Sequence, residues 1–195
     1  LIEAEGGADG RGLGAIQIDG VDISRLNLSQ LRSRLAIIPQ DPVLFNDTVR
    51  YNLDPFGTAD DDELERVLEL VQLADAIRAV EGGLDHKVSE GGANFSVGQR
   101  QLLCLARATL RRSSVLALDE ATASIDNETD AVLQMAIRQM FAECTVLTIA
   151  HRLHTIMDSS HVMLFDAGAL AEFDDPHRLL SDPASSFSQL VDKTG

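Results

Sequence analysis

The chain has no tryptophan, one tyrosine, two cysteines and two lysines among its 195 residues. It has no apolar run approaching the roughly 18 residues that suggest a membrane-spanning helix, and no secretory signal or transit peptide is visible. Cys104 falls inside a predicted helix and Cys144 beside a predicted strand. We therefore expect two buried, reduced thiols rather than a disulfide, which fits a cytosolic setting.

Positive charge is also scarce. The chain carries 16 lysines and arginines against 31 aspartates and glutamates, a net charge of −15. Nucleic-acid binding needs a basic face, so the charge argues against a nucleic-acid partner and against docking on anionic lipid. The length suits one domain, with room for a subdomain.

A phosphate-binding P-loop is missing as well. Residues 6–14, G-G-A-D-G-R-G-L-G, are rich in glycine and resemble such a loop at first sight. A P-loop has the pattern G-x-x-x-x-G-K-[ST], whose lysine reaches the β- and γ-phosphates. The lysines here are Lys87, after a histidine, and Lys193, after an aspartate. The sequence therefore contains no P-loop.

One stretch nevertheless predicts a helix start that suits phosphate. Ser96 and Gln99 form an S-x-x-Q capping box, and an apolar helical stripe follows. Val97 and Gly98 would lie in the first turn, where backbone N–H groups lack intrahelical partners and the dipole is positive. Such an end attracts phosphate, and a glycine lets a ligand approach the backbone. An ordinary capped helix would show the same pattern.

A second stretch predicts a strand that delivers acids to a ligand site. Residues 115–120 read V-L-A-L-D-E, an apolar run that ends in Asp119 and Glu120. The pattern indicates a buried parallel strand with carboxylates at its carboxyl end, where α/β sheets bind ligands. One carboxylate there can hold Mg²⁺ through water while the other polarises an attacking water. A strand running into a solvated loop looks the same in sequence.

Together these stretches resemble a known family. F-S-V-G-Q-R-Q, a helix, V-L-A-L-D-E and then A-S-I-D resemble the nucleotide-binding domain of ATP-binding-cassette (ABC) proteins. The matching parts are the signature motif, the Walker B strand with its catalytic glutamate, and the D-loop. D-P-V-L-F-N-D-T-V-R-Y-N-L-D-P-F is especially similar to the second such domain of the C subfamily, the multidrug-resistance-associated proteins. In this segment Phe45 is a candidate contact to the transmembrane partner, or else a core aromatic.

The resemblance implies a role for each motif residue. Glu120 would polarise the attacking water, and His151, in the H-loop-like T-I-A-H-R, would position it against the γ-phosphate. Asp119 and Gln40, the latter in a Q-loop position, would serve Mg²⁺. The signature residues would close the ATP site of a partner domain, and Asp126 would couple the two sites. The implied ATP-binding residues are Gln40, Ser96, Val97, Gly98, Gln99 and Asp126.

The implied fold is α/β, of the P-loop NTPase (RecA-like) type, with a mostly parallel sheet, an inserted helical subdomain and a truncated amino-terminal part. Residues 1–40 and 111–175 would belong to the ATPase core, 41–110 to the helical subdomain and 176–195 to carboxyl-terminal helices. Locally, the pattern predicts the tail of a helix at 1–5, a hairpin at 15–23, an amphipathic helix at 60–80 and another hairpin at 161–173. Shorter elements are predicted at 28–34 (helix), 35–38 (buried strand), 128–141 (helix), 145–149 (strand), 176–180 (helix) and 187–191 (helix).

The sequence departs from the family in three places. The P-loop is missing, so we expect the chain to be a fragment that does not bind ATP in cis, with part of its core exposed. Val97 stands where most signatures have glycine, and its isopropyl group would weaken contact with a partner's nucleotide. The glycine-rich segment at residues 8–13 is extended, without a predicted effect.

The sequence thus predicts an ATPase module, using ATP and Mg²⁺, that drives a membrane transporter from the cytosolic face. Its partners would be transmembrane domains of the same transporter and a second nucleotide-binding domain, paired head to tail. A non-hydrolysing or regulatory module of channel type remains an alternative, although Glu120 favours hydrolysis. A chromosome-maintenance or DNA-repair ATPase is disfavoured, because only about 55 residues separate Gln40 from Ser96 and no sustained heptads occur there.

Overall fold

We describe a computed structural model of the chain over residues 2–5, 15–119, 125–149 and 153–194. The chain divides into two compact units, residues 1–148 and 149–195, which are described in turn. The predicted subdivision into 1–40 with 111–175, 41–110 and 176–195 stays a prediction.

The first unit begins with a small antiparallel sheet rather than a helix. Its strands are β1 (Ile2–Glu5), β2 (Ala15–Ile18) and β3 (Val21–Asp22). The prediction of a helix tail at residues 1–5 is wrong, because this segment pairs along its length with β2, from Ile2 opposite Ile18 to Glu5 opposite Ala15. The hairpin prediction is confirmed: Asp19 and Gly20, with φ of 51° and 74°, form the two-residue turn between β2 and β3.

A short helical passage leads to the second sheet. It consists of a 3₁₀ turn, η1 (Ile23–Arg25), and α1 (Leu28–Arg34), which has its predicted bounds. Asn27 caps α1 by a capping box. Its Oδ1 accepts from the Gln30 N–H at 2.8 Å, and Gln30 Oε1 accepts from the Asn27 N–H at 3.3 Å.

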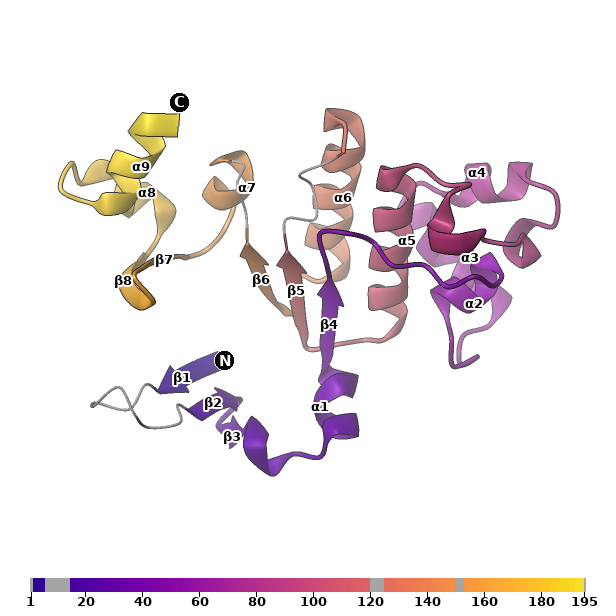
Figure 1. Ribbon diagram of the computed structural model, residues 1–195, viewed down its shortest axis with the longest axis horizontal. Coiled ribbons are helices and arrows are strands. Elements are labelled where there is room, and N and C mark those ends of the chain that lie inside the picture. The colour runs from indigo at the N-terminus through magenta and orange to yellow at the C-terminus, as the bar shows by residue number, and fades with distance from the viewer. Residues whose placement is uncertain (1, 6–14, 120–124, 150–152, 195) are drawn as a thin grey trace. The chain divides into compact units, whose positions relative to one another are not determined.

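The second sheet has the strand order β4–β5–β6. These strands are β4 (Leu35–Ile38), β5 (Val115–Asp119) and β6 (Thr145–Ile149). β4 and β5 are parallel, with Ala36 opposite Leu116 and Ile38 opposite Leu118, and the three arrows point the same way in Figure 1. The strand predicted at residues 35–38 is confirmed, but only one of its two faces is buried. Ile38 is fully buried, whereas Ile37 is 68% exposed.

Helices cover the buried face of this sheet and continue into a helical segment beside it (Figure 1). They are α2 (Val49–Leu53), α3 (Asp61–Leu70), α4 (Ala74–Ala79), the 3₁₀ turns η2 (Gly83–Asp85) and η3 (Glu90–Gly92), α5 (Val97–Leu110) and α6 (Asn127–Met140). The single helix predicted over residues 60–80 is wrong. Gln72 adopts φ of 56°, and the Leu73 N–H donates to the Leu68 carbonyl, so α3 ends and α4 starts afresh.

The core lies on both sides of α5, which packs against α3 on one side and against β4 and α6 on the other (Figure 1). Leu68 of α3, Leu103 and Leu105 of α5, Leu116 of β5 and Leu133 of α6 all have no exposed surface. Burying one such leucine stabilises the fold by about 1.5–3 kcal/mol. This packing fixes α5 against both β4 and α6, which is what positions the candidate site.

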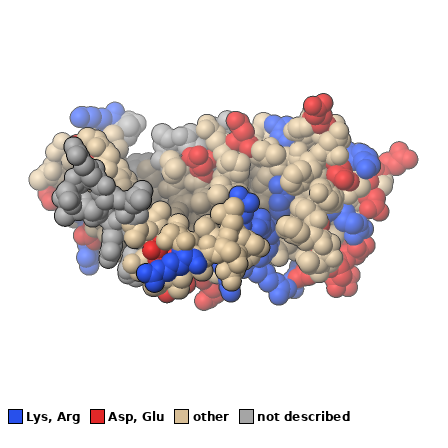
Figure 2. Space-filling model, turned by 60° about the horizontal axis from the view of Figure 1, so that its bottom comes forward, with Lys and Arg blue, Asp and Glu red and all other residues tan. Residues whose placement is uncertain are grey.

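Charged side chains of both signs are interspersed over the end of the molecule that carries α3 and α4 (Figure 2). Arg78 of α4 pairs with Glu65 and Glu69 of α3 at 2.7 and 2.8 Å, and Arg50 pairs with Asp61 and Asp85. These are exposed pairs, each worth little in stability.

The second unit is a hairpin with short helices. β7 (Val162–Asp166) and β8 (Ala169–Asp174) are antiparallel, as predicted, and α7 (Leu153–Met157), α8 (Pro176–Ser181) and α9 (Ser186–Thr194) complete the unit. The Glu172 carboxylate accepts from the Ser186 and Phe187 N–H groups at 2.7 and 3.0 Å and so caps the start of α9. Over the part of the chain described, no helix is long and apolar enough to cross a membrane.

Candidate functional site

Two of the predicted site residues follow neighbouring strands of the parallel sheet. Asp119 is the last residue of β5, and Gln40 lies two residues beyond the end of β4. Because β4 and β5 run parallel in register, both residues leave the sheet at its carboxyl edge, and both are exposed. This edge is where α/β sheets bind ligands.

A buried amide that the sequence did not single out ties this edge to α5. Gln101 has no exposed surface, and its Nε2 donates to the Gln40 carbonyl at 3.4 Å. Its Oε1 has no hydrogen-bond partner among the described residues. Gln101 therefore links the segment after β4 directly to the helix that follows Ser96.

The predicted start of α5 is confirmed in detail. Ser96 is the N-cap, and its Oγ accepts from the Gln99 N–H at 3.1 Å. Gln99 Oε1 accepts in return from the Ser96 N–H at 2.9 Å. Val97 and Gly98 occupy the first turn, where the helix dipole is positive.

Gly98 is required by packing, a reason that the sequence did not reveal. A Cβ placed on Gly98 would lie 2.6 Å from Cγ2 of Thr129, in the first turn of α6. The space beside Gly98 is thus taken by α6 of the same chain. The expectation that Gly98 frees room for a ligand stays untested.

Asp126 caps α6 and holds Thr129 in place. One carboxylate oxygen accepts from the Thr129 N–H at 2.9 Å, and the Thr129 hydroxyl donates to the other at 2.8 Å. These bonds, the backbone N–H of Thr129 first, lower the pKa of Asp126. Thr129 therefore bridges Asp126 and Gly98, two residues 28 positions apart in the sequence.

Asn94 organises the loop that leads into Ser96. Its Oδ1 accepts from the N–H of Ser89 at 3.0 Å, and its Nδ2 donates to the Lys87 carbonyl at 3.0 Å. The adjacent Phe95 is 8% exposed, with its ring edge-on to the His86 ring. The loop that precedes α5 is therefore held together by hydrogen bonds of the Asn94 side chain.

The segment predicted to face a transmembrane partner is held by a half-buried cation. Arg107 of α5 donates to the Asn52 carbonyl at 2.6 Å and to the Val43 carbonyl at 3.1 Å, and its guanidinium lies 5.0 Å from the Phe45 ring centroid. Burial lowers the pKa of Arg107. Phe45 is 44% exposed, so it is not a core aromatic.

Two predicted site residues, Glu120 and His151, lie outside the described residues.

The two predicted thiols differ in burial. Cys104 is buried as expected, whereas Cys144 is only half-buried, because it sits in the turn between α6 and β6. Both are free thiols.

The residues present fit a magnesium nucleotide better than a protein-only metal site. Within the described residues no group of three or more histidine, cysteine, aspartate or glutamate side chains could hold a metal. Mg²⁺ usually takes one or two carboxylates together with substrate phosphates and water. An exposed carboxylate, Asp119, and an exposed amide, Gln40, at the carboxyl ends of neighbouring strands suit that mode.

The parallel sheet edge, the capped α5 and the linked α6 define a nucleotide-binding domain of the ABC type. The family model described as "ABC transporter" matches residues 11–123. The chain belongs to the ABC transporter family.

Its relatives narrow this to the C subfamily. "ABC transporter C family member 3" of Dictyostelium discoideum is 57% identical over 182 residues, 93% of this chain and 13% of that protein. "ATP-binding cassette sub-family C member 2" of Mus musculus is 55% identical over 169 residues, 87% of this chain and 11% of that protein. The chain therefore spans only a small part of these relatives' length.

A solved structure agrees with the fold. The structure of a bacterial Atm1-family ABC exporter with ATP bound superposes with a TM-score of 0.85 and 34% identity, over 93% of this chain and 32% of that one. The predicted α/β class, with a parallel sheet and a helical segment, is confirmed.

Proposed function

We propose that the chain is the ATP-binding and ATP-hydrolysing module of an ABC transporter, which couples hydrolysis to movement of a substrate across a membrane. The observation that carries this proposal is the linkage of Gln40, Gly98 and Asp126. Gln101 ties Gln40 to α5, and Thr129 ties Gly98 to Asp126. A displacement of one motif would therefore shift the others, which a coupled ATPase requires.

Within one nucleotide site, Asp119 and Gln40 would hold Mg²⁺, whose charge would offset that of the phosphates. Glu120 polarises the attacking water and His151 positions it. A neutral imidazole both donates and accepts, so it suits this bridging role. Phosphoryl transfer needs little covalent help from a protein, and the rate comes mainly from positioning and charge neutralisation.

The amino end of α5 would act on the nucleotide of a second domain. Ser96, Val97, Gly98 and Gln99 would close that site in a head-to-tail pair, and Asp126 would connect the two sites. Transmembrane domains of the same transporter would contact the segment around Phe45, which places the module on the cytosolic face of the membrane.

Activity of the 195-residue chain by itself is not part of this proposal. The sequence has no P-loop lysine, and Val97 places an isopropyl group in the first turn of α5. We expect nucleotide binding and hydrolysis only in a complete transporter that supplies a P-loop. The competing hypothesis is a regulatory module that binds nucleotide without hydrolysing it.

The test is Glu120→Gln in the complete transporter that contains this domain. Losing the carboxylate should slow ATP hydrolysis by roughly a hundredfold while bound ATP accumulates. Glu128→Gln, a change in an exposed acid of the first turn of α6, is the matched control and should hydrolyse normally. Equal turnover in the Glu120 variant and the unaltered transporter would leave the regulatory hypothesis standing.

A further inference from the structure

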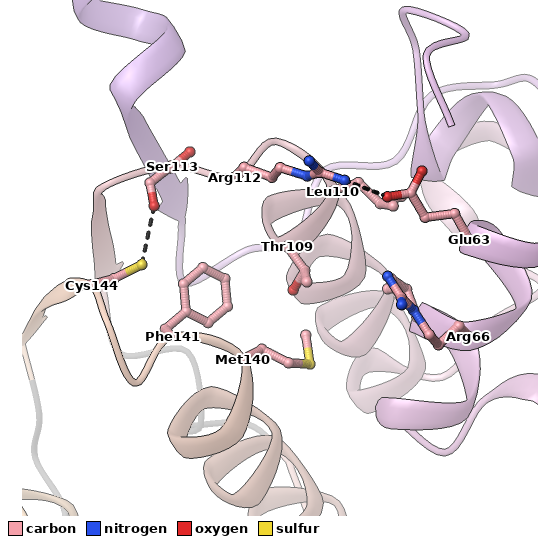
Figure 3. Close-up of a pocket in the computed structure, with 10 residues that line it drawn as sticks. Glu63, Arg66, Thr109, Leu110, Arg112, Ser113, Met140, Phe141 and Cys144 are labelled. Carbon is pink, nitrogen blue, oxygen red and sulfur yellow. Dashed lines mark hydrogen bonds and ion pairs between the residues drawn. The ribbon is translucent and has the colours of Figure 1, made fainter. Parts of the chain in front are cut away.

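A pocket of about 340 Å³ opens between α3, the carboxyl end of α5 and the carboxyl end of α6 (Figure 3). Its volume lies at the small end of the range for small-molecule sites. Val67, Leu110, Met140 and Phe141 supply apolar walls, and Arg66 and Arg112 supply positive charge.

The pocket is separate from the candidate nucleotide site. Ser113, in its wall, comes just before the amino end of β5, whereas Asp119 is at the carboxyl end. At about 3.3 Å per residue, the strand places these two residues roughly 20 Å apart. The pocket therefore touches the far ends of α5 and α6, whose amino ends carry Ser96 and Asp126.

The pocket has an excess of positive charge in a chain with net charge −15. Arg112 is paired with Glu63 at 2.8 Å, which leaves that pair neutral. Arg66 forms no ion pair with another described residue, and in Figure 3 its guanidinium extends toward the α5 side of the pocket. The charged residues that line the pocket, Glu63, Arg66 and Arg112, thus sum to one positive charge.

The inner walls are apolar and partly aromatic. Phe141 is 4% exposed and Val67 3% exposed, with the half-buried Met140 and Leu110 beside them. A phenyl ring and a thioether both favour contact with another aromatic ring. Ser113 Oγ, buried in the wall, has no hydrogen-bond partner among the described residues, so turning about χ1 toward an occupant would satisfy it.

We propose that this pocket binds a small amphipathic anion, an aryl ring that carries a carboxylate, sulfonate or phosphate group. The ring packs against Phe141 and Met140, and the anionic group lies at the rim beside Arg66 and Arg112. Such a ligand would contact α3, α5 and α6 at once and so brace the two helices that run to the candidate site. The proposal does not depend on ATP hydrolysis.

Calorimetric titration of the full chain with naphthalene-2-sulfonate tests the pocket, with the uncharged naphthalene-2-sulfonamide as the matched ligand. The sulfonate should bind, the sulfonamide should bind about fivefold more weakly, and Arg66→Gln should weaken the sulfonate by a similar factor. Arg25→Gln removes an exposed arginine from η1, outside the pocket, and should leave the affinity unchanged. Far-UV circular dichroism checks that each variant is folded.

Cys144 reports where the ligand binds, because it lines the pocket and is half-buried. Bound sulfonate should slow its alkylation by N-ethylmaleimide about tenfold at saturation. Cys104 adds little background, since burial raises the pKa of its thiol. The proposal is overturned if the sulfonate does not bind, if the sulfonamide or the Arg66 variant binds as tightly, or if binding leaves Cys144 unprotected.

Discussion

Thr129 fills the place that a side chain on Gly98 would need: an added Cβ would lie 2.6 Å from Thr129 Cγ2. Thr129 cannot readily rotate away, because its hydroxyl donates to Asp126 and its N–H donates to the same carboxylate. The amino ends of α5 and α6 are therefore in contact through one glycine and one threonine.

Gly98→Ala should consequently destabilise the chain, even though alanine favours a helix by about 1 kcal/mol over glycine. Overpacking costs about 1–3 kcal/mol and outweighs that gain. Urea unfolding would measure the loss. Adding Thr129→Ser, which removes Cγ2 and keeps the hydroxyl, should restore most of it. A double variant as unstable as Gly98→Ala would show that the steric contact is not the cause.

Any replacement of Arg107 that loses the several N–H donors of its guanidinium should destabilise the chain. It donates to the Asn52 carbonyl and side chain and to the Val43 carbonyl, and no carboxylate of the described residues pairs with it. Arg107→Lys keeps the charge but cannot span these acceptors, so we expect a loss of about 2 kcal/mol and faster proteolysis within residues 43–48. Arg111→Lys is the control, because Arg111 is exposed and its side chain donates to the Arg32 carbonyl. Similar losses at both positions would refute the special role of Arg107.

Asp54 should contribute stability that disappears in acid. Its burial opposes ionisation, but the N–H groups of Ala59, Thr58 and Phe56 donate to the carboxylate and outweigh burial, so its pKa is lowered. A lowered carboxyl pKa stabilises the fold above the unfolded-state value of about 3.9, and this stability is lost as pH falls through the folded-state pKa.

Asp54→Asn should therefore cost about 1–3 kcal/mol at pH 7, with the gap to the unaltered chain closing in acid below the unfolded-state pKa. Unfolding midpoints measured across pH would show this convergence. Asp192→Asn alters an exposed carboxylate in α9 and should leave the midpoints nearly unchanged. A gap that persists undiminished in acid would argue for a purely steric effect.

Two substitutions of similar size at Gln101 should differ in how much stability they cost. Gln101→Met removes the bond to Gln40 but also removes the unpaired Oε1, so we expect stability within about 1 kcal/mol of the original. Gln101→Glu buries a carboxylate opposite the Gln40 carbonyl and should cost more than about 2 kcal/mol at pH 7.

Burial raises a carboxyl pKa, so part of that loss should be recovered as pH falls, when the protonated acid can donate to the carbonyl. The measurement is the difference in unfolding free energy between the Glu variant and the original chain at pH 7 and pH 5. A difference that stays constant would mean that the site admits water.

Local signals predicted most elements, and the failures have a common cause. The capping box at Ser96 and the β-branched run at residues 145–149 act within a few residues, and both elements formed where expected. Residues 2–5 form a strand because of a partner 10 or more residues away, β2. Gln72 ends the first part of the helix predicted over residues 60–80 because it adopts a positive φ, although no glycine in the sequence marks that position. These outcomes depend on tertiary context.

In the candidate site, too, features set by local sequence were predicted and features set by tertiary contacts were not. Strand ends and the capping box predicted the positions of Asp119, Gln40 and Ser96, because each follows from its own segment. Asp126 was named only through the family resemblance, and its capping of α6 was not predicted. The residues that connect them, Gln101 and Thr129, could not be singled out, since a buried amide and a helix-start threonine have meaning only through what they touch. The roles of Glu120 and His151 remain predictions from motif position.

The exposed face of β4 and its edge away from β5 affect how the chain behaves in concentrated solution. β4 has one neighbour among the described strands, its sequence Leu-Ala-Ile-Ile is uncharged, and Ile37 is 68% exposed. An apolar border of this kind can recruit a strand from another copy. The net charge of −15 keeps copies apart at neutral pH, and this repulsion vanishes near the isoelectric point of about 4.5. Precipitation, followed by light scattering, should therefore begin on mild acidification, well before the carboxylates that hold the fold are protonated.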